Sequence, residues 1–512
     1  MKRIVSLILC AACMLVLCGC SSTDSVYVPT GDALSYDEDY TGPTVSYPTQ
    51  QPDSTPTLCY YPNESLNPYN CADFTNRVLF SFMYQSLFAI DRNYTPTPIL
   101  CKNYRVSQDM RTYTFYIENA TFSDGTPLTP EDVVASLNHA KQSPVYAGRF
   151  VHITEAVLAE DGGVNVKLDT ACENLPVLLD IPIVKATQLS ENAPLGTGPY
   201  ALENGTGGAR LRRVDSWWCS AELVITSPTI ALIPAQSETH IRDQFEFFDL
   251  DLVCADPGSD RYADFRCDFE LWDCENGIFL YLAFCANSEV FNTPQIRAAL
   301  TYAIDRDTLV KDYYRGFARS ATLPASPSSP YYNESLAAKY AYDSAKFAQA
   351  VDEAGIQGQT VVLLVNKGDS LRLRAARAIA SMLSDCGLTV QMKELSGSAY
   401  TNALKTRQFD LYLGQTKLSA NMDLSAFFST YGELSYGGVN DMAAYALCKE
   451  SLANYGNYYS LHKTVMDEGL LCPVLFRSYA VYATRGLMSS LTPSRDNIFY
   501  YSLGKTMEKA LL

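Results

Sequence analysis

The side chains best suited to metal binding or nucleophilic attack are thinly spread along this sequence. The 512 residues contain four histidines and sixteen cysteines. The histidines stand far apart, and beyond the first twenty residues no two cysteines form a CxxC pair. Structural zinc sites group Cys and His at short, regular spacings. The sequence therefore predicts no zinc site and places His139, His152, His240 and His462 on surfaces or in helices.

Enzymatic motifs are equally scarce. The chain has no GxSxG nucleophile elbow, no HExxH metal motif and no SxxK with partner motifs. The carboxylates Glu131 and Asp132 in "LTPEDVVASL" follow Thr129 and Pro130, where any helix start favours negative charge. We therefore expect no catalytic residue. An exported enzyme is the alternative, and a pocket that binds a ligand without changing it chemically would separate the two.

Composition points to a large, soluble, acidic protein. With 47% hydrophobic residues and 512 residues in all, the chain can bury two or three domain cores. Its net charge of −17 argues against nucleic-acid binding, because a basic face is needed to neutralise phosphates. The 35 tyrosines suit binding clefts, since each offers contact area together with a hydroxyl group.

The first twenty residues have the pattern of an export signal. Lys2 and Arg3 precede an apolar run, residues 4–17, that is too short to span a bilayer. "LCGC" at 17–20 resembles a bacterial lipobox, which implies acylation of Cys20 and attachment to the membrane. Residues 21–56 are rich in Ser, Thr, Pro, Asp and Tyr and are expected to form a disordered tether. An ordinary cleaved signal, with Cys20 in a disulfide, is the alternative.

Hydrophobic periodicity predicts an α/β protein. "TLCYY" and "RTYTFYIE" favour strands, "GIFLYLAFCANSE" a buried central strand, and "FEFFDLDLVCAD" a strand near a sheet edge. Asp73 is expected to cap a helix that runs through "FTNRVLFSFMYQSLFAI". From "QTVVLLVNKG" to "FDLYLGQTKL", strands alternate with helices, which predicts a mostly parallel sheet covered by helices.

Seven motifs in order resemble one family. They are "SLNPYN", "TYTFYIENATFSDGTPLTPEDVVASL", "GTGPY", "FNTPQIRAALTYAIDRDTLV", "YDSAKFAQAVDEAGI", "YTNALKTRQFDLYL" and "CPVLFRSYAVYA". Together they are similar to the extracytoplasmic solute-binding proteins of the peptide/nickel type, family 5, the receptors of ATP-driven importers. The resemblance covers roughly residues 57–500.

That resemblance implies a two-lobed, type II periplasmic-binding-protein-like fold that closes on its ligand. We expect an N-terminal lobe at 57–285, with an extra subdomain at about 91–185. A C-terminal lobe follows at 286–478, and residues 479–512 return to the first lobe. Crossover strands are expected near 280–287 and 476–484.

The resemblance also implies the function. The expected protein is a monomeric receptor without cofactor, lipid-anchored outside a Gram-positive type cell, that captures peptides or small solutes for an ABC permease. Three alternatives stay open: a non-transport surface sensor, a carrier of a non-peptide anionic solute, and a nickel or haem carrier, which the few histidines disfavour.

The ligand-binding residues implied by the resemblance include one departure. Peptide-binding relatives place an acid after the "FD" strand to pair with the peptide amine, but Ser419 and Ala420 stand there, and Asp423 comes three residues later. Lys417 and Arg477 would instead favour a carboxylate. Peptides remain the leading cargo, because backbone pairing holds them whatever their side chains. The full set of expected ligand-binding residues is Tyr61, Asn63, Lys417, Asn421, Phe476, Arg477 and Tyr479.

Overall fold

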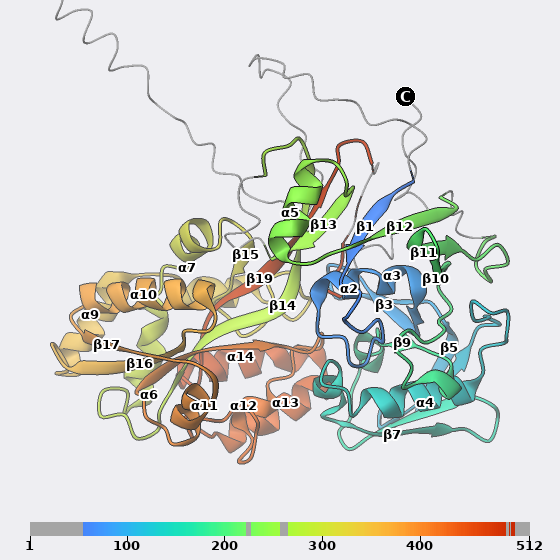
Figure 1. Ribbon diagram of the computed structural model, residues 1–512. Helices are drawn as coiled ribbons and strands as arrows, with labels where there is room; N and C mark the ends of the chain where they lie inside the picture. Colours follow the sequence, from blue (N-terminus) through green and yellow to red (C-terminus); the bar gives the residue numbers. More distant parts are fainter. Residues whose placement is uncertain (1–54, 222–226, 257–264, 488–490, 492, 497–512) are drawn as a thin grey trace, which may run out of the picture.

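The computed structural model describes residues 55–221, 227–256, 265–487, 491 and 493–496 (Figure 1). The signal sequence, Cys20 and nearly all of the expected tether therefore lie outside the described residues. Figure 1 shows two bodies joined by long strands, which we call the N-terminal lobe and the C-terminal lobe. This is the two-lobed α/β architecture that the sequence predicts.

One mixed sheet of eleven strands passes through both lobes. Its order is β10 (Tyr200–Gly205), β11 (Gly208–Arg213), β12 (Thr229–Pro234), β1 (Thr57–Tyr60), β13 (Leu252–Ala255), β19 (Cys472–Ala483), β14 (Glu270–Phe284), β18 (Leu411–Lys417), β16 (Thr360–Asn366) and β17 (Thr389–Leu395), with β15 (Ala318–Ser320) paired to β19.

The strands β14 and β19 connect the lobes. The end of β19 pairs with β13 in the N-terminal lobe, whereas β14 pairs with β18 of the C-terminal lobe from Ile278 onward. Between Glu275 and Phe279 the register of β14 against β19 shifts, and Gly277 there has φ +73°. A positive φ suits glycine because it has no Cβ to clash with the backbone. The sheet thus changes partners around Gly277, while the lobe boundaries given above stay a prediction.

The C-terminal lobe confirms the alternating pattern read from the sequence. Strand β16 pairs in parallel with both β17 and β18. Their connections are α10 (Ser370–Asp385) and α11 (Gly397–Lys405), and α9 (Ser344–Glu353) precedes β16. The other helices are α6 (Pro294–Ala299), α7 (Arg306–Thr308), α8 (Glu334–Ala337), α12 (Ser425–Phe428), α13 (Met442–Ala453) and α14 (Tyr458–Asp467).

The N-terminal lobe carries a second, smaller sheet. Its order is β5 (Cys101–Val106), β6 (Thr112–Ile117), β8 (Val164–Leu168) and β7 (Ile153–Leu158), and α4 (Pro130–Ala140) packs on it. The helix begins where the sequence predicts: the Thr129 side chain and Asp132 form a reciprocal capping box. These elements lie within the expected extra subdomain at about 91–185.

Two sequence-based expectations are wrong. The helix after Asp73 was expected to continue to Ile90, but it comprises only α2 (Phe74–Val78) and α3 (Phe80–Met83). It is followed by β2 (Gln85–Ser86) and β3 (Phe88–Ile90). The distant strand β9 (Pro182–Ile183) pairs with β2, and β4 (Pro96–Pro98), which follows shortly after, pairs with β3, so that this stretch is extended.

The segment expected as an edge strand is the second error. Its first part belongs to α5 (Glu238–Glu246) and its second part is β13, which lies between β1 and β19 inside the sheet. Alternation of acidic and apolar residues led to the edge assignment, whereas all four residues of β13 are buried.

The described residues contain no helix long and apolar enough to cross a bilayer and no group of three metal-ligating side chains. The twelve cysteines from Cys59 to Cys472 are all buried. Buried cysteines pack as small apolar side chains, so they contribute to the cores of both lobes.

Candidate ligand-binding site

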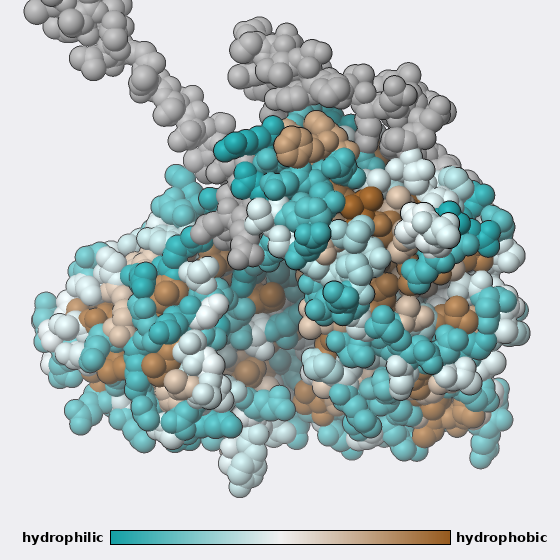
Figure 2. All heavy atoms as spheres, viewed as in Figure 1, coloured by the Kyte–Doolittle hydropathy of each residue, from teal (hydrophilic) through white to brown (hydrophobic). Residues whose placement is uncertain are grey.

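Figure 2 shows a hollow between the lobes. Of two adjoining cavities, one is lined by residues of both lobes and the other by the N-terminal lobe together with Ser494 and Asp496. The larger, which we call the junction cavity, has a volume of about 150 Å³ and the smaller, the side cavity, about 40 Å³. Both are lined by Arg77, Ser81 and Asp496. The rest of the junction cavity is lined by Phe74, Val78, Asn276, Ile278, Lys417, Tyr479 and Arg495.

Elements of both lobes position this lining. Helix α2 begins at Asp73, whose side chain accepts a 3.0 Å hydrogen bond from the Asn76 backbone N–H, and it brings Arg77 to the cavity. From the C-terminal lobe, Lys417 ends β18 directly opposite Ile278 of β14. A molecule bound here would contact both lobes and the strands that connect them.

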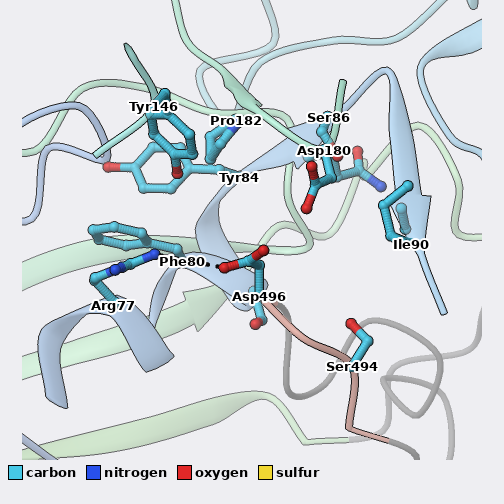
Figure 3. Close-up of a pocket in the computed structure, with 13 residues that line it drawn as sticks. Arg77, Phe80, Tyr84, Ser86, Ile90, Tyr146, Asp180, Pro182, Ser494 and Asp496 are labelled. Carbon is cyan, nitrogen blue, oxygen red and sulfur yellow. Dashed lines mark ion pairs between the residues drawn. The ribbon is translucent and has the colours of Figure 1, made fainter. Parts of the chain in front are cut away.

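Asp496 is the electrostatic centre of the site. Its carboxylate pairs with Lys417, lies 3.1 Å from Arg149 Nη2 and 3.1 Å from Arg495 Nε, and is 4.0 Å from Arg77 Nη2. Figure 3 shows it pointing from the C-terminal segment toward Arg77. Burial opposes ionisation, but these cations outweigh it and hold the pKa of Asp496 well below its ordinary value.

A second carboxylate, Asp180, pairs with Arg149 beside this centre, and both side chains are about nine-tenths buried. Burial raises the pKa of Asp180 despite the neighbouring Arg149 guanidinium. With both carboxylates ionised, the four cations around Asp496 leave an excess of two positive charges. Such an excess in a partly buried site favours an anionic ligand.

Lys417 and Arg495 are the two cations of this cluster that border the junction cavity together with Arg77. Burial of its ammonium, with help from Arg495 and Arg77, lowers the pKa of Lys417 to about 8 even though Asp496 opposes this. The side chain of Arg495 is only 5% exposed, and its Nη1 has no hydrogen-bond partner among the described residues. Its guanidinium carbon lies 2.7 Å from the place where a Cβ on Gly277 would stand, so that glycine makes room for it.

Of the ligand-binding residues expected from the sequence, the structure brings Lys417 and Tyr479 to the junction cavity. The Tyr479 hydroxyl donates a 2.6 Å hydrogen bond to the Ser494 carbonyl, and its ring packs against Phe74 at 5.6 Å between centroids. Tyr479 therefore holds the segment that carries Asp496 against the cavity.

The other expected residues line none of these cavities. Phe476 is fully buried and stacks on Phe279 in the core. The Asn421 amide oxygen accepts a hydrogen bond from Ser419, and the Tyr61 backbone is bonded by Asn76. Asn63 is exposed.

Arg477 is committed to protein partners. Its guanidinium pairs with Asp256 after β13, donates a 2.9 Å hydrogen bond to Gln415 of β18, and lies 3.5 Å from Asp369 at the start of α10. The side chain is only 9% exposed. This arrangement ties β19 to both lobes at the crossover.

Sequence reasoning missed five residues of the cluster: Arg77, Arg149, Asp180, Arg495 and Asp496. Apart from the neighbours Arg495 and Asp496 they lie far apart along the chain, and no local pattern marks them as a site. Arg77 had the nearest signal, because it stands on the helix that follows the "SLNPYN" motif.

The lobes also touch at a second place. His152 Nε2 lies 3.3 Å from Asp423, which precedes α12, and its Nδ1 lies 2.9 Å from Asp169. Burial opposes protonation of the ring, but Asp423 and Asp169 together raise the pKa of His152. Asp423, the acid nearest to the family's amine-binding position, is thus engaged by the other lobe. Nearby, the Glu173 backbone N–H donates to the Leu452 carbonyl at 2.8 Å.

A third cavity of about 190 Å³ is lined by the β14 residues that precede Gly277, among them Asp273 and Glu275. Tyr94 donates a 2.6 Å hydrogen bond to Glu275, and burial raises the pKa of that carboxyl group. Asp273 is 3.0 Å from Arg319. The two cavities thus differ: cations predominate at the junction cavity, whereas the third cavity contains an Asp273–Arg319 ion pair and the Glu275 carboxyl group.

Comparison with known proteins agrees with this architecture. The profile of "Bacterial extracellular solute-binding proteins, family 5 Middle" matches residues 95–437. The glutathione-binding protein GsiB of Escherichia coli strain K12 is 23% identical over 394 residues, which cover 73% of this chain and 74% of that protein.

Solved structures share the fold at low identity. The substrate-binding protein CtaP of Listeria monocytogenes superposes with a TM-score of 0.72 at 18% identity, covering 89% of this chain and 99% of that one. NikA of Brucella suis, in complex with Fe(III)-EDTA, gives 0.70 at 19%, covering 87% and 99%. AppA of Bacillus subtilis, in complex with a nonapeptide, gives 0.62 at 19%, covering 88% and 98%.

The family profile spans the middle of the chain, from the small sheet of the N-terminal lobe to the loop before α13. The two lobes, the crossover strands and the cavity between them complete the agreement. The chain therefore belongs to the bacterial extracellular solute-binding proteins of family 5, which capture a solute outside the cytoplasm for an ABC importer.

Proposed function

We propose that this protein captures peptides or related small solutes that carry a negative charge, and delivers them to an ABC permease. One observation carries the proposal: the junction cavity is built from α2 of one lobe and β18 of the other, and positive charge predominates there. A ligand bound to both walls stabilises the closed arrangement of the lobes.

The ligands named for the relatives support this charge preference. Glutathione, Fe(III)-EDTA and a nonapeptide are the molecules named for GsiB, NikA and AppA. Each of these molecules presents carboxylate groups. Arginine and lysine hold carboxylates through charge-assisted hydrogen bonds, which are roughly twice as strong as neutral ones.

Within the expected residue set, we propose Lys417 and Tyr479 as ligand contacts, joined by Arg77 and Arg495. Tyr61, Asn63, Asn421, Phe476 and Arg477 stay predictions from the family resemblance. We also propose the division into lobes at 57–285 and 286–478 with a return from 479, and a monomer as the working unit. Binding proceeds without chemical change to the ligand and without a cofactor.

We further propose attachment to the membrane through an acylated Cys20, as in Gram-positive type bacteria. The support is the "LCGC" pattern after an apolar run. Cys20→Ala should release the protein into the medium, whereas wild type should sediment with membranes. Membrane retention of the variant would contradict acylation at this position.

A thermal-shift screen of peptide and solute libraries, including glutathione, tests the proposed capture. A ligand present at 100 times its Kd stabilises the folded state by ~2.7 kcal/mol. Anionic ligands should give the largest shifts, and Lys417→Ala should reduce them. Lys405→Ala, on the outer helix α11, is the matched control that should leave them unchanged.

Two outcomes would contradict the proposal. One is a preference for cationic ligands that Lys417→Ala and Arg477→Ala leave intact. The other is the appearance of a reaction product during incubation. A surface sensor on the same fold is the second candidate, and deletion of the gene distinguishes it, because a sensor's loss leaves uptake of the identified ligand unchanged.

A further inference from the structure

Cationic side chains surround the Asp496 carboxylate as they would surround the carboxylate of a bound ligand. Its cationic partners come from separate parts of the fold: Arg77 from α2, Arg149 from the short helix η1 (Ala147–Phe150), and Lys417 from β18. Two of these parts belong to the N-terminal lobe and one to the C-terminal lobe. A single carboxylate thus bridges both walls of the junction.

The junction cavity also holds a cationic hydrogen-bond donor that an anion could use. Arg495 is 5% exposed and leaves Nη1 without a hydrogen-bond partner among the described residues, and it lines the junction cavity. The cavity of about 150 Å³ adjoins Asp496 and matches the size of a cavity that accepts a benzene-sized molecule. It therefore admits the carboxylate end of a ligand rather than a whole peptide.

Replacing Asp496 by another carboxylate preserves the charge balance. Removal of one partner from a buried ion pair is costly because the other charge is left uncompensated. When a ligand carboxylate takes the place of Asp496, however, Arg149 and Lys417 keep an anionic partner throughout. In this segment the Ser494 carbonyl accepts a hydrogen bond from the Tyr479 hydroxyl, and neither group is charged.

We propose that the junction cavity is a subsite for a free carboxylate of the ligand, and that Asp496 occupies its cations as an internal competitor until the ligand replaces it. This inference rests on the proposed function and names the ligand group that the site selects. It also assigns the segment around Ser494 and Asp496 a role in setting affinity. The apparent Kd equals the intrinsic Kd divided by the fraction of molecules in which Asp496 does not fill the subsite.

The test compares one tetrapeptide pool synthesised as free acids with the same pool carrying C-terminal amides, together with glutathione. Binding is measured by native mass spectrometry and by calorimetry of the retained species. Wild type should retain free acids over amides. Asp496→Asn should bind the free acids about tenfold more tightly or better, because an internal competitor present in nine-tenths of molecules lowers apparent affinity tenfold.

Matched variants separate competition from structure. Asp496→Glu keeps the charge and should show no gain. Asp161→Asn removes a carboxylate from a surface pair with Arg105 and should change nothing. Should Asp496→Asn fail to fold, a crystal structure of wild type with the tightest free acid decides: the ligand carboxylate should contact Lys417 and Arg149, with Asp496 moved away.

The outcomes distinguish this inference from the proposed function. Weaker or unchanged binding of free acids by Asp496→Asn, or a complex in which Asp496 keeps its four partners, overturns the competitor. Equal binding of acids and amides overturns the carboxylate subsite and leaves capture of peptides intact. Failure to bind either pool or glutathione overturns the proposed function itself.

Discussion

His152 Nε2 lies 3.3 Å from Asp423 Oδ2, and this pair joins the N-terminal lobe to the C-terminal lobe away from the crossover strands. The ring is flanked on its other side by Asp169 at 2.9 Å. Cys172, Cys448 and Tyr458 lie near Asp423, and none of these three side chains carries a positive charge that would compete with His152 for the carboxylate. The pair is therefore strongest when His152 is protonated.

The pair makes stability depend on pH in a defined direction. Because the pKa of His152 is raised in the folded state, its contribution is full below the unfolded pKa of ~6.5 and is lost as pH rises through the folded pKa. His152→Gln should cost ~1–2 kcal/mol of unfolding free energy at pH 5 and much less at pH 8. Denaturant titrations at both pH values measure this difference.

The control for this prediction is His240→Gln, which changes a histidine on α5, remote from the contact between the lobes. It leaves the contact between His152 and Asp423 intact. An equal loss at pH 5 and pH 8 for His152→Gln would show that the ring acts through packing alone.

Gly277→Ala should destabilise the crossover. An alanine there adopts φ +73° and places its Cβ 2.7 Å from the Arg495 guanidinium carbon. The backbone strain alone costs ~1–2 kcal/mol. Gly125→Ala, with φ +82° and open space around its Cβ, has the same strain without the clash. A larger loss at Gly277 in denaturant unfolding would measure displacement of Arg495, and equal losses would argue against it.

Arg149→Met should be strongly destabilising, by ~3–5 kcal/mol, because it leaves Asp180 and Asp496 buried without this cation. Adding Asp180→Asn should recover part of the loss by removing one uncompensated charge. A double-mutant cycle in guanidinium chloride measures the coupling. Additive effects of the two changes would mean that the pair contributes no net interaction.

The native protein should resist thiol reagents. The cysteines from Cys59 to Cys472 are buried, and burial raises the pKa of Cys59 to about 12, which suppresses the reactive thiolate. A chain expressed from residue 21 should react slowly with Ellman's reagent at pH 8 and fully in denaturant. Rapid labelling of the native chain would indicate that a lobe opens locally.

Local signals were enough to predict many elements. Thr129, Pro130 and Asp132 specify the start of α4 within four residues, so their prediction is confirmed. The same holds for the alternation that gives β16, β17 and β18, because both connecting helices bury apolar residues and α10 is capped by the Asp369 side chain.

Elements decided by distant partners could not be predicted. The position of β13 inside the sheet depends on β1 and β19, and β2, directly after Met83, depends on β9. The site shows the same division: Lys417 and Tyr479 lie next to or within family motifs, whereas Arg149 and Asp496 are separated by 347 positions in the sequence. Arg477 looked available for a ligand because Asp256, Gln415 and Asp369 could not be foreseen as its partners.

The order of strands in the main sheet has a mechanical consequence. The described chain enters through β1 and leaves through the end of β19, and both lie beside β13. The whole body between Phe284 and Cys472 is thus a loop-like insertion, attached by two neighbouring strands. A tether attached ahead of Thr57 connects directly to the N-terminal lobe alone. The C-terminal lobe can therefore rotate about the crossover strands without straining that attachment.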